Sequence, residues 1–215
     1  GSLEFSDDLV ELDATIVDGA ADLTTAFWLK TSKTGQQAIV SAARSDSSNN
    51  EYLLFFQNDT ELRFFSGSNR SFTGLPSIAD DEWHHFVVVA DSSADKVELY
   101  LDGAFHSSIS IDLDGFDVAA GGLFLGQDQD RVGGDFDENQ AIEGSLDEFA
   151  MWRRALNSEQ ARQVFKSGVE SISADLAVYL PLDDASGNIA SDASGLGRDG
   201  RVAERTGEFQ SGSSA

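Results

Sequence analysis

Apolar and polar residues alternate along much of this chain, with the period of two that is typical of half-buried β-strands. In KVELYLDGAFHSSISI, Val97, Leu99 and Leu101 are separated by single polar or amphipathic residues. Asp102 and Gly103 follow, and both residue types tolerate the positive φ that a two-residue turn requires. The segment therefore predicts a tight β-hairpin.

Further strands are marked by the same alternation or by short apolar runs. They are residues 23–31, 37–44, 51–57, 61–67, 83–91, 122–127 and 145–153. Clusters of Asp, Ser, Asn and Gly separate them, and the chain has only two prolines. Many short strands of this kind predict an all-β, antiparallel sandwich.

One short α-helix is predicted at residues 156–168, LNSEQARQVFKSG. Asn157 or Ser158 is a suitable N-cap, and an acidic residue follows in the first turn. Lys166 and then Gly168 are typical of a helix C-terminus, so the helix is expected to end there.

Composition narrows the possible partners. The chain has 215 residues, 38 acidic and 14 basic, with a formal charge of −24. A nucleic-acid surface needs clustered Lys and Arg, and an anionic membrane repels such a chain, so we expect neither partner. No apolar run approaches the length that spans a bilayer, which argues against direct membrane insertion. Salt or divalent cations would screen the self-repulsion, which favours a marine, halophilic or calcium-rich setting. We expect an extracellular or cell-surface location.

Cysteine is absent from the sequence. Disulfide bonds, thiolate metal sites and cysteine nucleophiles are thereby excluded, and the redox state of the compartment is left open.

The acidic residues concentrate in one stretch, residues 126–144, GQDQDRVGGDFDENQAIEG, which holds six acidic residues and one basic residue. Carboxylate, amide and backbone carbonyl oxygens are the ligands that calcium takes in proteins, six to eight at a time. The glycine pair at 133–134 would let the loop fold back. A metal site is one interpretation, and a solvated acidic loop is the other.

An EF-hand would use some of the same positions, since Asp128, Asp130 and Gly133 match its first, third and sixth residues. Val132 and Asn139 stand where that motif needs a ligand and a bidentate Glu, and no helix flanks the loop. The EF-hand interpretation is therefore rejected.

Three stretches together resemble the laminin-G and pentraxin group of concanavalin A-like sandwiches. DEWHHFVVVADSSADKVELYLDG (81–103) is similar to the central hairpin of that group. EGSLDEFAMWRRALNSEQ (143–160) is similar to the strand, Trp and short helix that follow it, and the acidic stretch matches the metal loop of pentraxins. The resemblance implies an antiparallel jelly-roll β-sandwich.

The resemblance to pentraxins also implies a two-calcium site. The residues at the corresponding positions are Asn49, Asn50, Asp128, Gln129, Asp130, Asp137 and Gln140. Asn49 stands where Asp is usual, and Asp128 and Asp137 stand where the longer Glu is usual. These differences could shift the cations inward or leave a single ion, so one or two calcium ions are expected.

The segment 174–202 returns to a strand and then a loop rich in Gly, Asp and Ser, and it resembles the opening of many bacterial laminin-G-like repeats. No long linker precedes it, so we expect it to pack with the rest in a single domain, residues 1–215. Asp183, Asp192 and Asp199 could hold a separate structural calcium, but these are also ordinary turn residues.

The sequence gives little support for a catalytic site. Related sandwich glycanases place two Glu residues around an Asp on one strand. Glu11 and Asp13 begin that pattern, but Ile16 stands where the second Glu belongs, so no proton donor faces the nucleophile. We therefore expect no enzyme activity.

Aromatic residues are mostly expected in the core, because packing between two sheets consumes large apolar side chains. A neighbouring pair such as Phe64 and Phe65 must point one ring outward. Phe65 or Phe72 is therefore a candidate for a ligand-binding surface.

Together, the residues and the resemblance indicate a calcium-dependent carbohydrate-binding module, a lectin or adhesin, within a larger extracellular protein. Its expected partners are a carbohydrate, or an anionic glycan or phosphate-bearing ligand held through calcium, and neighbouring modules of the same polypeptide. A bound cation reverses the local sign and lets an acidic protein bind an anion. The alternative is a structural or protein-interaction spacer with purely structural calcium. A glycan-active enzyme domain is the third interpretation.

Overall fold

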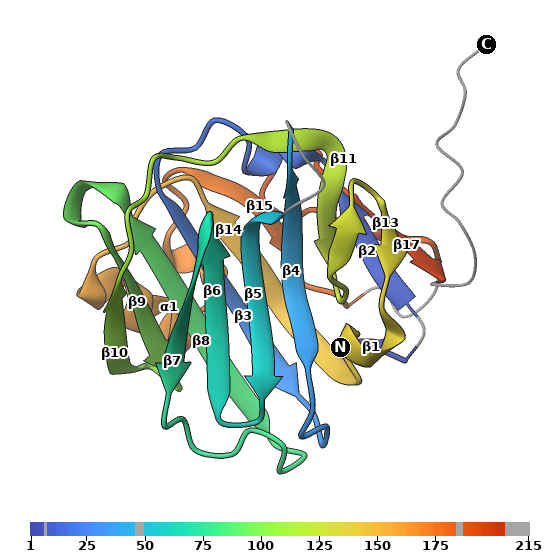
Figure 1. The fold of residues 1–215 in the computed structure, drawn as a ribbon, viewed down its shortest axis with the longest axis horizontal. Helices are drawn as coiled ribbons and strands as arrows, with labels where there is room; N and C mark the ends of the chain where they lie inside the picture. The colour runs from blue at the N-terminus through green and yellow to red at the C-terminus, as the bar shows by residue number, and fades with distance from the viewer. Residues whose placement is uncertain (7, 46–49, 184–186, 205–215) are drawn as a thin grey trace.

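The computed structural model describes residues 1–6, 8–45, 50–183 and 187–204, which form two stacked antiparallel sheets (Figure 1). The seven-stranded sheet runs in the order β1 (Leu3–Phe5), β14 (Gly144–Trp152), β3 (Leu23–Lys30), β8 (Trp83–Asp91), β9 (Lys96–Leu101), β10 (Ala104–Ser110), and β15 (Leu176–Leu180) also pairs with β14.

The eight-stranded sheet lies against it. Its order is β16 (Ile189–Ala190), β17 (Gly200–Glu204), β2 (Asp8–Leu12), β11 (Val118–Leu125), β4 (Gln37–Arg44), β5 (Asn50–Asn58), β6 (Glu61–Ser66), β7 (Ser68–Thr73). A separate small hairpin is formed by β12 (Gln129–Arg131) and β13 (Gly134–Phe136). Short 3₁₀ turns are η1 (Ala14–Ile16), η2 (Ser92–Ala94), η3 (Glu138–Gln140) and η4 (Val169–Ser171).

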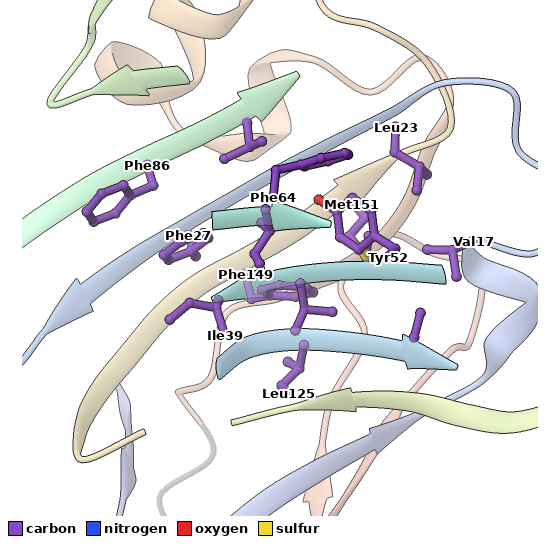
Figure 2. Close-up of a cluster of buried hydrophobic side chains, with 14 of the residues drawn as sticks. Val17, Leu23, Phe27, Ile39, Tyr52, Phe64, Phe86, Leu125, Phe149 and Met151 are labelled. Atoms are coloured by element: carbon purple, nitrogen blue, oxygen red, sulfur yellow. The ribbon is translucent and has the colours of Figure 1, made fainter. Parts of the chain in front are cut away.

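The main hydrophobic core fills the space between the sheets (Figure 2). Phe27 and Phe86 stack with ring centroids 5.1 Å apart, and Tyr52 meets Phe64 edge to face at 5.5 Å. The buried Tyr52 hydroxyl shares a 2.7 Å hydrogen bond with the Thr25 hydroxyl, which removes the cost of burying it alone. The structure is the antiparallel jelly-roll β-sandwich that the sequence predicts.

A second core covers the outer face of the seven-stranded sheet. Helix α1 (Ser158–Ser167) places Ala161 and Val164 in a buried cluster that also contains Trp152. The Trp152 indole donates a 2.7 Å hydrogen bond to the Ile172 carbonyl. Because β8 is covered on both faces, its central residues 85–90 are all buried, which explains the unbroken apolar run there.

The predicted hairpin and helix are confirmed. Asp102 and Gly103 have φ values of 50° and 75°, and Leu101 pairs with Ala104 across the two-residue turn. The Asn157 side chain accepts from the backbone N–H groups of residues 159 and 160 in a capping box, and Gly168 with φ 81° ends the helix.

Other boundaries differ from the prediction. The strand expected at 122–127 starts at residue 118 and ends at 125, and β7 was not predicted because its sequence, SNRSFT, has one apolar residue. The segment 174–202 contributes β15 to one sheet and leads into β16 and β17 of the other. None of the helices that the structure describes has the length and apolarity to cross a membrane.

Candidate functional site

The acidic stretch forms a small hairpin followed by a 3₁₀ turn, beside β4 (Figure 1). Arg131 pairs with Gly134, and Gly133, with φ 70°, allows the two-residue turn between them. Asp137 caps η3, because its Oδ1 accepts from the backbone N–H of Asn139 at 2.9 Å. The loop is therefore a folded unit on the outside of the eight-stranded sheet.

Two buried glutamines fasten this unit to the sheet. The Gln129 amide nitrogen donates to the carbonyls of Ser41 and Gly122 at 3.1 and 3.0 Å, and its Oε1 accepts from the Gly133 N–H at 3.0 Å. The Gln127 amide nitrogen donates to the Asp137 carbonyl at 2.9 Å. The side chain of Gln129 thus holds the loop against the sheet. Only the backbone carbonyl of Gln129 could serve as the predicted metal ligand.

A cavity of about 300 Å³ lies between this unit and the outer face of β5 and β6. Five predicted metal ligands line it: Asn50, Asp128, Gln129, Asp130 and Gln140. Its floor is formed by the outward-facing residues Leu53, Phe55, Arg63 and Phe65. The fold therefore brings the start of β5 next to a loop that follows it by almost 80 residues.

Three side chains that line this cavity carry buried oxygen atoms, one a carboxylate and two amides. Asn50 Nδ2 donates to Asp128 Oδ1 at 2.7 Å, while Asn50 Oδ1 and Gln140 Oε1 are buried and accept no hydrogen bond within the described residues. Asp128 is 8% exposed, and its burial raises the pKa to about 6, with the nearby Asp130 carboxylate adding to this rise. A buried carboxylate, and buried amide oxygens that accept no hydrogen bond, are costly alone and fit a hard cation such as calcium.

The two remaining predicted ligands are Asp137 and Asn49. Asp137 does not line the cavity, because its carboxylate caps η3 and also accepts from the Asn139 side chain at 2.8 Å. Asn49 lies outside the described residues. Across the described ranges, no three His, Cys, Asp or Glu side chains are grouped closely enough to hold a metal ion. The candidate site is thus a mixed set of carboxylate and amide oxygens.

The C-terminal aspartates of the predicted structural calcium site each have a partner within the chain. Asp192 accepts through both oxygens, from the backbone N–H groups of Tyr179 at 3.0 Å and Arg198 at 2.9 Å. Asp199 accepts from the Asp192 N–H at 2.8 Å, while Asp183 pairs with the N-terminal amino group. Among the described residues these three carboxylates do not form a group that could hold a metal ion, and hydrogen bonds account for Asp192 and Asp199. The separate structural calcium stays a prediction.

Of the two aromatic candidates, one lines the cavity. Phe65 pairs with Leu53 on the outer face, and both line it. Phe72 is 1% exposed and lies in the core beside its partner Leu62, so its prediction as a ligand-binding residue is wrong. The cause is the pleat: adjacent strands present paired residues to the same side of the sheet.

Sequence reasoning missed Leu53, Phe55 and Arg63 as part of the site. Tyr52, Leu54 and Phe56 all lie in the core, so the residues between them must face outward. That alternation was visible in the sequence, but which outward face carries a cavity was not.

The acids considered for catalysis have structural partners. Glu11 Oε2 accepts from Arg201 Nε at 2.9 Å in an ion pair between β2 and β17. Asp13 Oδ1 accepts from the Thr15 N–H at 2.9 Å and caps η1. These contacts give both carboxylates a structural role.

Comparison with known proteins gives one family and several relatives. Residues 5–162 match the laminin-G type of the concanavalin A-like lectin/glucanases superfamily. The chain is 28% identical over 181 residues to mouse sushi, von Willebrand factor type A, EGF and pentraxin domain-containing protein 1, covering 81% of this chain and 5% of that protein. It is 31% identical over 155 residues to human pentraxin-4, covering 69% of this chain and 32% of that protein. The chain thus spans less than two thirds of the length of either relative.

Two solved structures have the same fold. A putative carbohydrate binding protein from Bacteroides ovatus superposes with a TM-score of 0.74 at 19% identity, covering 94% of this chain and 57% of that one. The heptameric SAP-like pentraxin from Limulus polyphemus superposes with a TM-score of 0.62 at 23% identity, covering 75% of this chain and 77% of that one. At these identities the likeness establishes the fold alone.

Proposed function

The chain belongs to the concanavalin A-like lectin/glucanases superfamily as a laminin-G-like, pentraxin-like member, and we propose that it is a calcium-dependent carbohydrate-binding module of a larger extracellular protein. The proposal is for binding without catalysis. The similarity to a putative carbohydrate binding protein supports the ligand class, and the size of the mouse relative supports a module within a longer chain.

One observation carries the proposal: a buried carboxylate and two buried amide oxygens that accept no hydrogen bond within the described residues belong to side chains lining one cavity. Asp128, Asn50 and Gln140 come from three separate segments of the chain. A cavity that existed only for packing would satisfy these atoms with donors or exclude them. Their arrangement supports a site that is completed by a cation.

The residues of this cavity would supply different kinds of oxygen ligand to calcium. Asp128 and Asp130 would supply carboxylate oxygens, and Asn50 and Gln140 would supply amide oxygens. The Gln129 carbonyl would contribute from the backbone, while its side chain keeps the loop in place. Calcium, when bound, supplies coordination positions for hydroxyl, carboxylate or phosphate oxygens of a ligand. Asn49 and Asp137 remain proposed ligands, with one or two ions.

The apolar floor of the cavity would provide packing contacts for the ligand beside the calcium site. Phe65 and Leu53 are paired across β5 and β6 and face the cavity together. Apolar walls with a few placed polar groups are the usual composition of a small-molecule site. The C–H faces of a sugar ring would pack on this floor while its hydroxyl groups meet the cation.

Titration calorimetry tests the proposal in two steps, first with calcium and then with a glycan panel, in the presence and absence of a chelator. We expect calcium to bind and the glycan signal to depend on it. Asp130→Asn should weaken calcium binding, whereas Asp135→Asn should not, because Asp135 is an exposed residue of the same loop that pairs with Arg131. The two variants change the net charge equally.

The possible outcomes separate the functions. Calcium binding without any calcium-dependent glycan signal would favour a structural spacer over a lectin. Glycan binding that survives the chelator would overturn the role of calcium.

A further inference from the structure

Arg63 faces the same cavity from the middle of β6. Its neighbours Leu62 and Phe64 lie in the core, so the pleat places Arg63 and Phe65 on the outer face of the sheet. Arg63 pairs with Phe55 on one side and with Ser71 on the other. Arg63 thus lines the cavity from the outer face of the sheet.

Within the described part of the chain, Arg63 is the only basic residue that lines this cavity. Its Nε lies 3.5 Å from Glu61 Oε1, at the limit of a hydrogen bond, and the Arg63 side chain is 39% exposed. Glu61 is also held by the Ser71 hydroxyl, which donates to the same oxygen at 2.7 Å. A long ion pair at a partly exposed position contributes little, so the guanidinium keeps donors for a ligand.

Arg63 and the proposed calcium ligands occupy different parts of the cavity. Phe55, the partner of Arg63, is five residues along β5 from Asn50, a Cα separation of about 16 Å in an extended strand. Phe65 lies between these two ends. A ligand that reached both would be an oligosaccharide, with one unit at the cation and another at Arg63.

The chemistry of Arg63 identifies the group that such an oligosaccharide would carry. A planar guanidinium matches carboxylate and sulfate oxygens, with two parallel hydrogen bonds and opposite charge. The chain as a whole carries a formal charge of −24 and repels polyanions at long range, so attraction to an acidic group must be local.

Building on the proposed function, we propose that Arg63 makes this cavity selective for oligosaccharides that carry an anionic group, a carboxylate or a sulfate, on the sugar unit beyond the calcium-bound one. The cation and Arg63 are then two anchors at the ends of one cavity, with Phe65 between them.

The experiment compares trigalacturonic acid with its methyl ester, by calorimetry at fixed free calcium. The two probes differ only in their charged groups. We expect about a tenfold preference for the acid, which Arg63→Gln removes, so that the variant binds the acid and the ester with equal affinity. Arg63→Lys should keep part of the preference, because it retains the charge and loses the paired hydrogen bonds. A sulfated oligosaccharide and its desulfated counterpart form a second arm that distinguishes sulfate from carboxylate.

Arg70→Gln is the matched control, since Arg70 lies on the adjacent strand, is exposed, and donates to the Ser110 carbonyl away from the cavity. It removes the same charge and should leave the preference intact. Equal binding of acid and ester, or a preference that survives Arg63→Gln, would overturn the selectivity while calcium-dependent binding of both probes still stood. Failure of every probe to bind in calcium would count against the proposed function and this selectivity together.

Discussion

Replacing Asp128 with Asn should make the protein more stable than the parent in chelator and less stable than the parent at high calcium. Burial raises the pKa of Asp128 from 3.8 to about 6, so the folded chain binds more protons than the unfolded chain between these pH values. The free energy of unfolding therefore falls as pH rises through this window, and the full cost is present above pH 6. At about 1.4 kcal/mol for each pH unit, that cost is about 3 kcal/mol at pH 7.

Asn removes this cost without changing the shape of the side chain. Its carbonyl can still accept the hydrogen bond that Asn50 donates to Asp128 at 2.7 Å. In chelator at pH 7, we expect Asp128→Asn to be more stable than the parent protein by up to about 3 kcal/mol, or on the order of 6–12 °C in the unfolding midpoint. The gain should shrink towards zero as the pH is lowered from 6 to 4.

Calcium acts in the opposite direction, because the variant lacks a charged ligand. A free calcium concentration of 100 times Kd adds about 2.7 kcal/mol to the parent protein, and 1,000 times Kd adds about 4.1 kcal/mol. The difference between the two proteins should therefore vanish near the first concentration and reverse near the second.

Urea unfolding followed by tryptophan fluorescence measures both effects at constant ionic strength. Asp135→Asn is the control, because Asp135 is exposed in the same loop and the charge change is identical. If the two variants have the same stability in chelator, the buried carboxylate carries no cost and the reasoning from burial to cation binding fails. If both variants gain as much from calcium as the parent protein, Asp128 is no ligand.

Two further predictions concern the scaffold. Burial lowers the pKa of His84, but the carboxylates of Asp102 and Asp80 raise it by more, so its pKa in the folded chain lies above 6.5. The stability that this raised pKa adds is complete below pH 6.5 and is lost as pH rises through the folded pKa. Urea unfolding of the parent protein and His84→Gln should show their difference shrinking from pH 6 to 8, and a constant difference would contradict it. Gly144→Ala should lower the free energy of unfolding by about 3 kcal/mol or more, because the added Cβ would meet the backbone carbonyl of Lys30 on the neighbouring strand. Gly67→Ala is the control, since Gly67 is also at positive φ but in open space, and it should cost about 1 kcal/mol. Equal losses of stability in thermal melts would refute the clash at Gly144.

Much of the fold could be predicted because its signals are local. The alternation in residues 96–111 and the Asp-Gly pair between them specify a hairpin whatever surrounds it, and Asn157 caps its helix through contacts within one turn. β7 was not predicted because Phe72 is its only apolar residue and its only buried one, and a single apolar residue leaves no period to detect. The failure with Phe72 has the same origin, since its side of the sheet is decided by pairing with β6.

The candidate site was predictable in part, and for a different reason. The composition of the acidic stretch indicates oxygen ligands for a metal. The prediction that Asn50 joins them came from the family resemblance and not from the residues near Asn50 in the sequence. The structure brings Asn50 within 2.7 Å of Asp128, and it leaves Asp137 as the cap of a 3₁₀ turn. It also gives Asp183, Asp192 and Asp199 different partners, which the Gly-, Asp- and Ser-rich sequence of that loop could not reveal.

The sequence by itself determined the strand periods, the turn and cap residues, the acidic charge and the kinds of atoms available for binding, because these depend on neighbours along the chain. Only the tertiary structure decided which of those atoms share a cavity. Strand order sets β5 beside β6 and β4 beside the acidic hairpin, so that Arg63, Phe65 and Asn50 lie on one outer face with Asp128. Burial then decided their chemistry, since the same Asp in water would be an ordinary solvated carboxylate, and here burial raises its pKa to about 6.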